Sequence, residues 1–128
     1  MAGKFDAIII GAGIIGASVG LELARRGWRT LNVDPAAGYG STSASCAIIR
    51  SHYSTLDGTA LAFEGYQYWR HWAAHLSVED ERGLARFEEV GCAIMKTELN
   101  GHMASICANL DALNIAWEDW DNDTIMKR

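Results

Sequence analysis

Three glycines spaced G-x-G-x-x-G constrain the fold of this chain more than any other feature. They separate a short apolar run at residues 5–10 from an amphipathic stretch at residues 14–26, and a second apolar run at residues 30–33 ends at Asp34. The glycines are Gly11, Gly13 and Gly16. A strand, a glycine turn, a helix and a second strand in this order predict a parallel βαβ unit.

The glycine turn predicts a site for the ADP half of a dinucleotide such as FAD or NAD. Gly11 allows a sharp turn, Gly13 has no Cβ to hold a pyrophosphate away from the backbone, and Gly16 lets the helix lie close to the sheet. The helix N-terminus offers unpaired N–H groups and the positive end of its dipole. Asp34 comes 18 residues after Gly16, where a carboxylate accepts hydrogen bonds from ribose hydroxyls.

Two other interpretations of the same residues are weaker. A glycine turn that binds nothing leaves Asp34 unexplained. A secretory signal is disfavoured because Glu22, Arg25 and Arg26 interrupt the apolar stretch that follows Lys4 before any cleavage site.

Charge and length narrow the class of protein further. The net charge of −5 argues against nonspecific nucleic-acid binding, and no run approaches the roughly 20 apolar residues that cross a bilayer. The three cysteines have no metal-site spacing and indicate a cytoplasmic protein. Because 128 residues leave too little chain for a complete dinucleotide sheet and a substrate domain, we expect an N-terminal fragment of a longer protein.

Apolar periodicity predicts an α/β fold in two parts. Residues 1–76 are expected to form the Rossmann-like segment, and residues 77–128 the start of an interleaved, mixed α/β substrate domain. Further helices are expected at about 59–76, with Asp57 as the cap, at about 103–113, after a turn at Asn100–Gly101, and from near 121 onward. Strands are expected at 90–96 and 116–118.

The loop after Asp34 favours FAD over a nicotinamide cofactor. An NAD-type domain would continue into another helix and a third strand, whereas this chain has small hydroxyl residues, Gly40-Ser41-Thr42-Ser43, and then Ile48-Ile49-Arg50. Hydroxyl groups donate hydrogen bonds to phosphate or ribityl oxygens. An arginine just beyond such a loop is suited to binding a carboxylate with both arms of its guanidinium group.

With these motifs the chain resembles the D-amino-acid-oxidase-like superfamily of FAD-dependent oxidoreductases, especially sarcosine oxidases, including their beta-subunit-like relatives. The resemblance implies that Arg50 binds the substrate carboxylate and that Tyr53 lies near the substrate. It also implies an FAD-binding set drawn from the turn, the acid and the loop. That set is Gly11, Gly13, Ile14, Ile15, Gly16, Asp34, Ser41, Thr42 and Ser43.

The chain departs from its relatives at two loop positions. Ala44 stands about where dimethylglycine-dehydrogenase-like members have a histidine that attaches covalently to FAD, so that linkage is not expected there. Ala47 stands where some sarcosine oxidases have an arginine near the flavin.

The resemblance implies an enzyme that oxidises the C–N bond of a small amine or amino acid, such as a sarcosine-like, N-methyl or D-amino acid, by hydride transfer to flavin. This fragment alone is expected to retain FAD weakly and to be inactive. The alternatives are an NAD-dependent dehydrogenase segment and a non-catalytic nucleotide-binding module. No metal site is expected, since His71 and His75 have no third ligand at useful spacing. The oligomeric state is left open.

Overall fold

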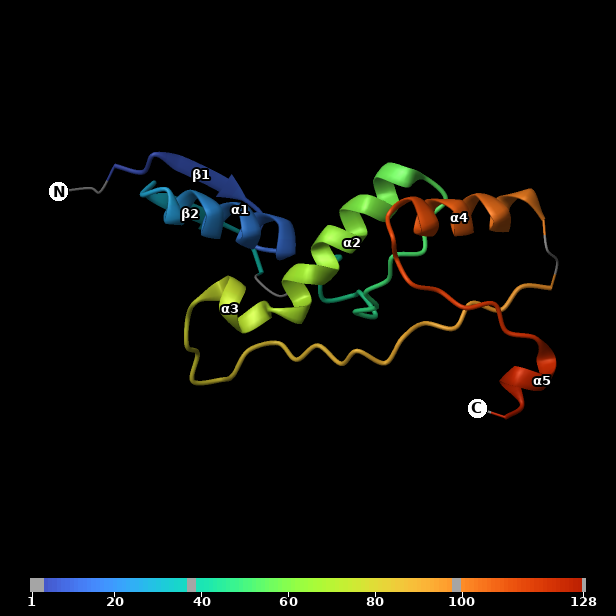
Figure 1. The fold of residues 1–128 in the computed structure, drawn as a ribbon. Coiled ribbons are helices and arrows are strands. Elements are labelled where there is room, and N and C mark those ends of the chain that lie inside the picture. The colour runs from blue at the N-terminus through green and yellow to red at the C-terminus, as the bar shows by residue number, and fades with distance from the viewer. Residues whose placement is uncertain (1–3, 37–38, 98–99, 128) are drawn as a thin grey trace. The chain divides into compact units, whose positions relative to one another are not determined.

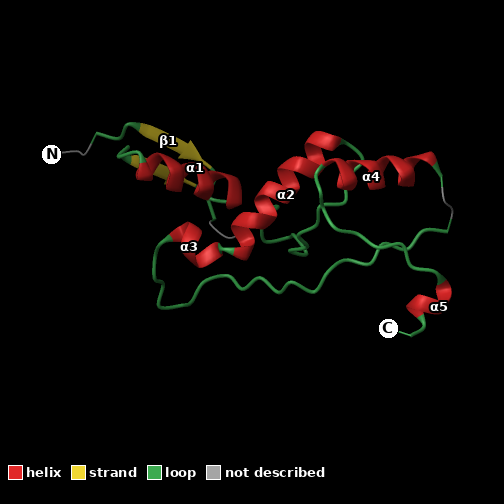
Figure 2. Cartoon of the chain, in the orientation of Figure 1, coloured by secondary structure: helices red, strands yellow, loops and turns green. Residues whose placement is uncertain are grey.

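The computed structural model describes residues 4–36, 39–97 and 100–127. The chain divides into two compact units, Met1–Ile48 and Ile49–Arg128. Strands occur in the first unit alone among the described residues, and the second unit consists of helices joined by irregular segments (Figures 1 and 2). The proposed division at residue 76 into cofactor and substrate segments stays a prediction.

The first unit is the βαβ arrangement that the glycine pattern predicts. It contains β1 (Ala7–Ile10), α1 (Ile14–Arg25) and β2 (Thr30–Val33), and the two strands pair in parallel. In the observed register Ala7 lies opposite Thr30 and Ile10 lies opposite Val33. The turn after α1 depends on Gly27, whose φ of +80° is a left-handed conformation that ends the helix and releases the chain into β2.

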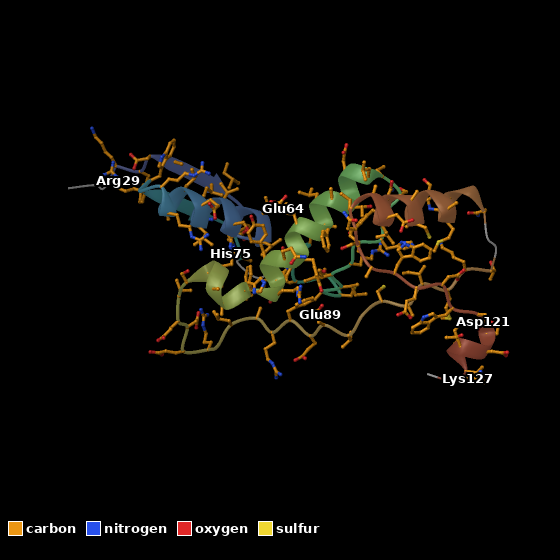
Figure 3. All side chains as sticks on the ribbon, in the orientation of Figure 1. Arg29, Glu64, His75, Glu89, Asp121 and Lys127 are labelled. Atoms are coloured by element: carbon orange, nitrogen blue, oxygen red, sulfur yellow. The ribbon has the colours of Figure 1, made fainter. Side chains whose placement is uncertain are left out.

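An ion pair joins the N-terminal ends of the two strands. Asp6 accepts hydrogen bonds from Nε and Nη2 of Arg29, both at 3.0 Å, and also from the backbone N–H of Arg29 at 2.9 Å. These bonds lower the pKa of Asp6 to about 2, chiefly through the side chain of Arg29, which Figure 3 labels. The pair therefore fixes the strand register at the end opposite the glycine turn.

Four helices lie in the described part of the second unit, residues 49–97 and 100–127. They are α2 (Leu56–Arg70), α3 (Trp72–Leu76), α4 (Gly101–Ala112) and α5 (Asn122–Ile125). Three of them begin at a polar residue whose side chain accepts a hydrogen bond from a backbone N–H of the first turn. The capping residues are Thr55 for α2, Asn100 for α4 and Asp121 for α5.

Two helix boundaries differ from the sequence prediction. The expected helix at 59–76 begins earlier and breaks at His71, whose φ of −116° and ψ of 32° separate α2 from α3. Thr55, and not Asp57, is the capping residue, so that Asp57 lies in the first turn instead. The Asn100–Gly101 pair forms the start of α4 and not a separate turn, while the predicted helix start near 121 is confirmed.

The predicted strands at 90–96 and 116–118 are wrong, and with them the mixed α/β character of residues 77–128. Neither segment forms a strand in the structure. A strand is stable only when its backbone N–H and C=O groups pair with a neighbour, and no strand of the described second unit offers that pairing.

Packing in the second unit centres on α2 and α4. Ile106 and Leu110, one turn apart on α4, are its buried apolar residues, and Thr59 of α2 is fully buried. The segment after α3 is tied to α2 through Glu89, labelled in Figure 3, which accepts from the hydroxyl of Tyr66 and pairs with Arg70 at 3.2 Å. These two contacts hold the segment around Glu89 to α2.

Candidate FAD-binding site

The glycine turn brings the end of β1 against the start of α1. Gly11 has a φ of +107°, which favours glycine, and its N–H donates to the carbonyl of Val33 at 2.8 Å. A Cβ placed on Gly16 would lie 2.1 Å from the carbonyl oxygen of Gly11 and 3.5 Å from Cγ2 of Ile9. The absence of a side chain at Gly16 is therefore what allows the helix to approach the strand this closely.

The hydroxyl loop reaches the N-terminus of α1 through Thr42. Its Oγ1 accepts a hydrogen bond from the backbone N–H of Ile14 at 3.1 Å. The same oxygen would lie 3.0 Å from a Cβ on Gly13, so the lack of a side chain at Gly13 lets the Thr42 hydroxyl reach the helix terminus. Gly13 is the N-cap of α1 and has no side chain to bond the first-turn N–H groups, which include that of Ile15. This terminus suits an anionic oxygen ligand.

Asp34 lies at the C-terminal end of β2 and faces the same turn. Its Oδ2 accepts from the N–H of Ala12 at 2.7 Å, and its Oδ1 accepts from the N–H of Ala36 at 2.8 Å. These two bonds, that of Ala12 first, lower the pKa of Asp34, so the group is an ionised acceptor at neutral pH. Each carboxylate oxygen keeps acceptor capacity for a hydroxyl donor, which fits a ribose diol.

The structure thus brings most of the predicted cofactor residues together in the first unit. The three glycines, Asp34 and Thr42 meet around the turn, with Ile14 and Ile15 in the first turn of α1. Ser41 and Ser43 lie on either side of Thr42, are exposed, and have no hydrogen-bond partner for their hydroxyls among the described residues. The predicted loop includes residues 37–38, which lie outside the described residues.

Sequence reasoning missed two supports of this site. The N–H of Ala12 orients Asp34 from a position that the fingerprint leaves variable. Asn32, between Leu31 and Val33 of β2, donates from Nδ2 to the carbonyl of Gly16 at 3.2 Å, and its Oδ1 would lie 3.0 Å from a Cβ placed on Gly20. A polar residue between two apolar residues of the strand was the available signal for this second contact.

Arg50 and Tyr53 belong to the second unit and contact each other. The guanidinium carbon of Arg50 lies 5.4 Å from the ring centre of Tyr53, a cation–π geometry. The backbone carbonyl of Tyr53 accepts from Oγ1 of Thr59 at 3.2 Å and from Nδ2 of Asn109 at 3.4 Å, so the segment is held to both α2 and α4. Within the described chain Arg50 forms no ion pair with a carboxylate, which leaves its guanidinium group available to an anion.

The described residues contain neither a metal-ligand cluster nor a membrane-spanning helix. No group of three or more His, Cys, Asp or Glu side chains there is placed to hold a metal ion. No helix in the part of the chain that the structure describes has the length and apolar character needed to span a membrane.

Comparison with known proteins agrees with the geometry of the turn. Residues 6–113 match the family described as FAD dependent oxidoreductase, and that span contains the glycine turn, Asp34, the hydroxyl loop and Arg50. No match was found among curated proteins or among solved structures. The groups at the turn fit this cofactor, since the first turn of α1 has no side-chain cap on its N–H groups and the ionised Asp34 can accept from a hydroxyl. The chain belongs to the FAD-dependent oxidoreductase family, and its cofactor is FAD.

Proposed function

We propose that the protein oxidises the C–N bond of a small amine or amino acid that carries a carboxylate. The observation that carries this proposal is Arg50, an exposed guanidinium group that stacks on Tyr53 and has no carboxylate partner in the described chain. A guanidinium group binds a carboxylate with two parallel hydrogen bonds, which fixes the orientation of the ligand as well as its charge.

The turn in the first unit would hold the ADP half of FAD. The N–H group of Ile15 would donate to the pyrophosphate, and that of Ile14 would exchange its bond to Thr42 for a phosphate oxygen. Asp34 would accept from the ribose hydroxyls. Ser41, Thr42 and Ser43 would contact the rest of the cofactor. The bound cofactor supplies the redox chemistry by accepting a hydride from the carbon next to the substrate nitrogen.

Arg50 and Tyr53 would act on the substrate. Arg50 would neutralise and orient the carboxylate, and the ring of Tyr53 would restrict the guanidinium group to one side. Orientation matters because a hydride moves only between atoms held in contact. Sarcosine-like, N-methyl and D-amino acids all present a carboxylate one carbon from the nitrogen, so we propose this group of substrates.

The two alternatives are less well supported. A nicotinamide-dependent dehydrogenase is disfavoured because the family is FAD-dependent. A non-catalytic nucleotide-binding module would need no site for a substrate carboxylate, so it does not explain the unpaired guanidinium group of Arg50.

We also propose that residues 1–76 bind the cofactor and that residues 77–128 begin the substrate domain. The three cysteines form no disulfide, and we propose on that ground that the protein is cytoplasmic.

The test, made on the full-length gene product, is anaerobic reduction of the bound flavin, followed by the loss of its visible absorption. Sarcosine and dimethylamine form a matched pair, because they share a methylated nitrogen and differ in the carboxylate. We expect bleaching by sarcosine-like or D-amino acids and little by the amine without a carboxylate. Equal bleaching by both compounds would contradict the role of Arg50, and no bleaching by any amine would contradict the proposed function.

A further inference from the structure

The contact between Arg50 and Tyr53 lies at the surface of the second unit. Arg50 is exposed, and Tyr53 keeps 40% of its accessible surface. A cation–π contact at an exposed site is weak, and a long arginine side chain loses much rotational freedom when it is held in one place. The contact therefore orients Arg50 only if the ring of Tyr53 is itself held by the rest of the unit.

The backbone carbonyl of Tyr53 is held by side chains from two helices. Oγ1 of Thr59 lies 3.2 Å from this oxygen and 3.0 Å from the carbonyl oxygen of Thr55, so its one proton is shared between the two. Nδ2 of Asn109 donates to the carbonyl of Tyr53 at 3.4 Å. Tyr53 is thereby tied to the first turn of α2 and to the last turn of α4 (Figure 1).

Thr59 is the better protected of the two donors. It is fully buried, whereas Asn109 is half-buried. A hydrogen bond shielded from water is stronger than an exposed one, and packing fixes the rotamer of its donor. The neighbouring Gly58 also lets Tyr53 come close to the helix, since a Cβ there would lie 3.6 Å from Cβ of Tyr53. The first turn of α2 therefore determines where the side chain of Tyr53 starts.

We propose that Thr59 is a positioning residue of the substrate site and acts on Arg50 through Tyr53. Its hydroxyl fixes the backbone of Tyr53, and the ring of Tyr53 restricts the guanidinium group of Arg50. That group then presents both arms to a carboxylate in one orientation. The identity of this ligand rests on the proposed function, whereas the coupling of Thr59 to Arg50 does not.

The coupling is tested by nuclear magnetic resonance of the Arg50 side chain in the 128-residue chain. An aromatic ring shifts the signals of protons held over its face, so Hε of Arg50 reports the position of the Tyr53 ring. Tyr53→Leu removes the ring and supplies the unshifted reference. We expect Thr59→Val to lose most of the shift, because valine has nearly the shape of threonine but no hydroxyl. Thr59→Ser keeps the hydroxyl and should keep the shift.

Ile106→Val is the control for a purely structural effect. It removes one methylene group from the core of the same unit and should lower its stability. No hydrogen bond to Tyr53 is lost, so the signal of Arg50 should stay in place. A signal that Thr59→Val leaves unchanged, or that Ile106→Val moves as far, would overturn the proposal.

Kinetics of the full-length gene product provide the second test. Thr59→Val should raise KM for sarcosine about threefold to tenfold, with a smaller change in kcat, because Arg50 is less well oriented. Thr59→Ser should restore KM, and Ile106→Val should leave it unchanged. If Arg50→Ala raises KM and Thr59→Val does not, the positioning role is rejected and the proposed function stands. If the native protein oxidises no amine, the proposed function fails, and the Arg50 signal still decides the coupling.

Discussion

Replacement of Gly16 by alanine tests whether close contact between α1 and β1 shapes the cofactor turn. The new Cβ would lie 2.1 Å from the carbonyl oxygen of Gly11 and 2.9 Å from its carbonyl carbon. Both atoms belong to the backbone, so the turn or the helix must move by about 1 Å to reach an ordinary contact. Overpacking of this kind destabilises a protein by about 1–3 kcal/mol. A helix gains at most about 1 kcal/mol when alanine replaces glycine, so the steric effect dominates.

Gly65→Ala is the matched control. Gly65 lies in the interior of α2, and a Cβ there would meet nothing within 4 Å, so only the gain in helix propensity remains. Hydrogen exchange, read separately over residues 4–36 and 56–76, reports the local stability of each region. We expect faster exchange around the turn and at least tenfold weaker FAD binding for Gly16→Ala, and slower or equal exchange in α2 for Gly65→Ala. A Gly16→Ala protein with unchanged exchange and FAD affinity would refute the close-contact argument.

Three further predictions concern single side chains. Asp34→Asn removes an ionised hydrogen-bond acceptor, and hydrogen bonds to a charged group are worth about 1.5–3 kcal/mol. This variant should therefore bind FAD about tenfold to a hundredfold more weakly, as measured by fluorescence titration. In the full-length gene product, Arg50→Ala should raise KM for carboxylate substrates by a similar factor, with a smaller change in kcat. The control Arg82→Ala removes an arginine that pairs with Asp80 on an exposed loop, and it should leave KM unchanged. An unchanged KM would show that Arg50 does not bind the substrate carboxylate.

The third of these is a pH dependence. Because Arg29 lowers the pKa of Asp6 to about 2 in the folded chain, the ion pair contributes its full stability above the unfolded pKa of 3.8 and loses it as the pH falls toward 2. Urea unfolding of the native chain and of Asp6→Asn should therefore differ at pH 5 and above and converge near pH 2. A constant difference would contradict the pairing.

Local patterns in the sequence were enough to predict the first unit. The apolar runs, the three glycines and Asp34 follow one another within 30 residues, and the contacts that they form are between near neighbours in the sequence or across one parallel pair. The same holds for Asp121 and Thr124, where a capping bond spans three residues. Such elements depend on their own residues more than on distant partners.

The sequence failed to predict secondary structure and contacts that depend on residues far away in the chain. The run at 90–96 has an apolar sequence suited to a strand, yet no strand lies beside it in the described second unit. Thr42 bonds Ile14 across 28 residues, and Asn109 bonds Tyr53 across 56, and no local pattern signals either contact. The observed N-cap of α2, Thr55, lies two residues before the predicted one, Asp57, and helix ends are commonly uncertain by that much.

The central claim, that the glycine turn of this chain holds the ADP half of FAD, is tested most directly by backbone amide spectra of the ¹⁵N-labelled protein. ADP and FAD are added in turn, with flavin mononucleotide, which lacks the adenosine half, as the control. The account predicts that ADP and FAD shift the amide signals of Ala12, Gly13, Ile14 and Ile15 and those next to Asp34, and that the mononucleotide leaves the signals next to Asp34 in place. Shifts confined to other parts of the chain, or none at all with FAD, would contradict it.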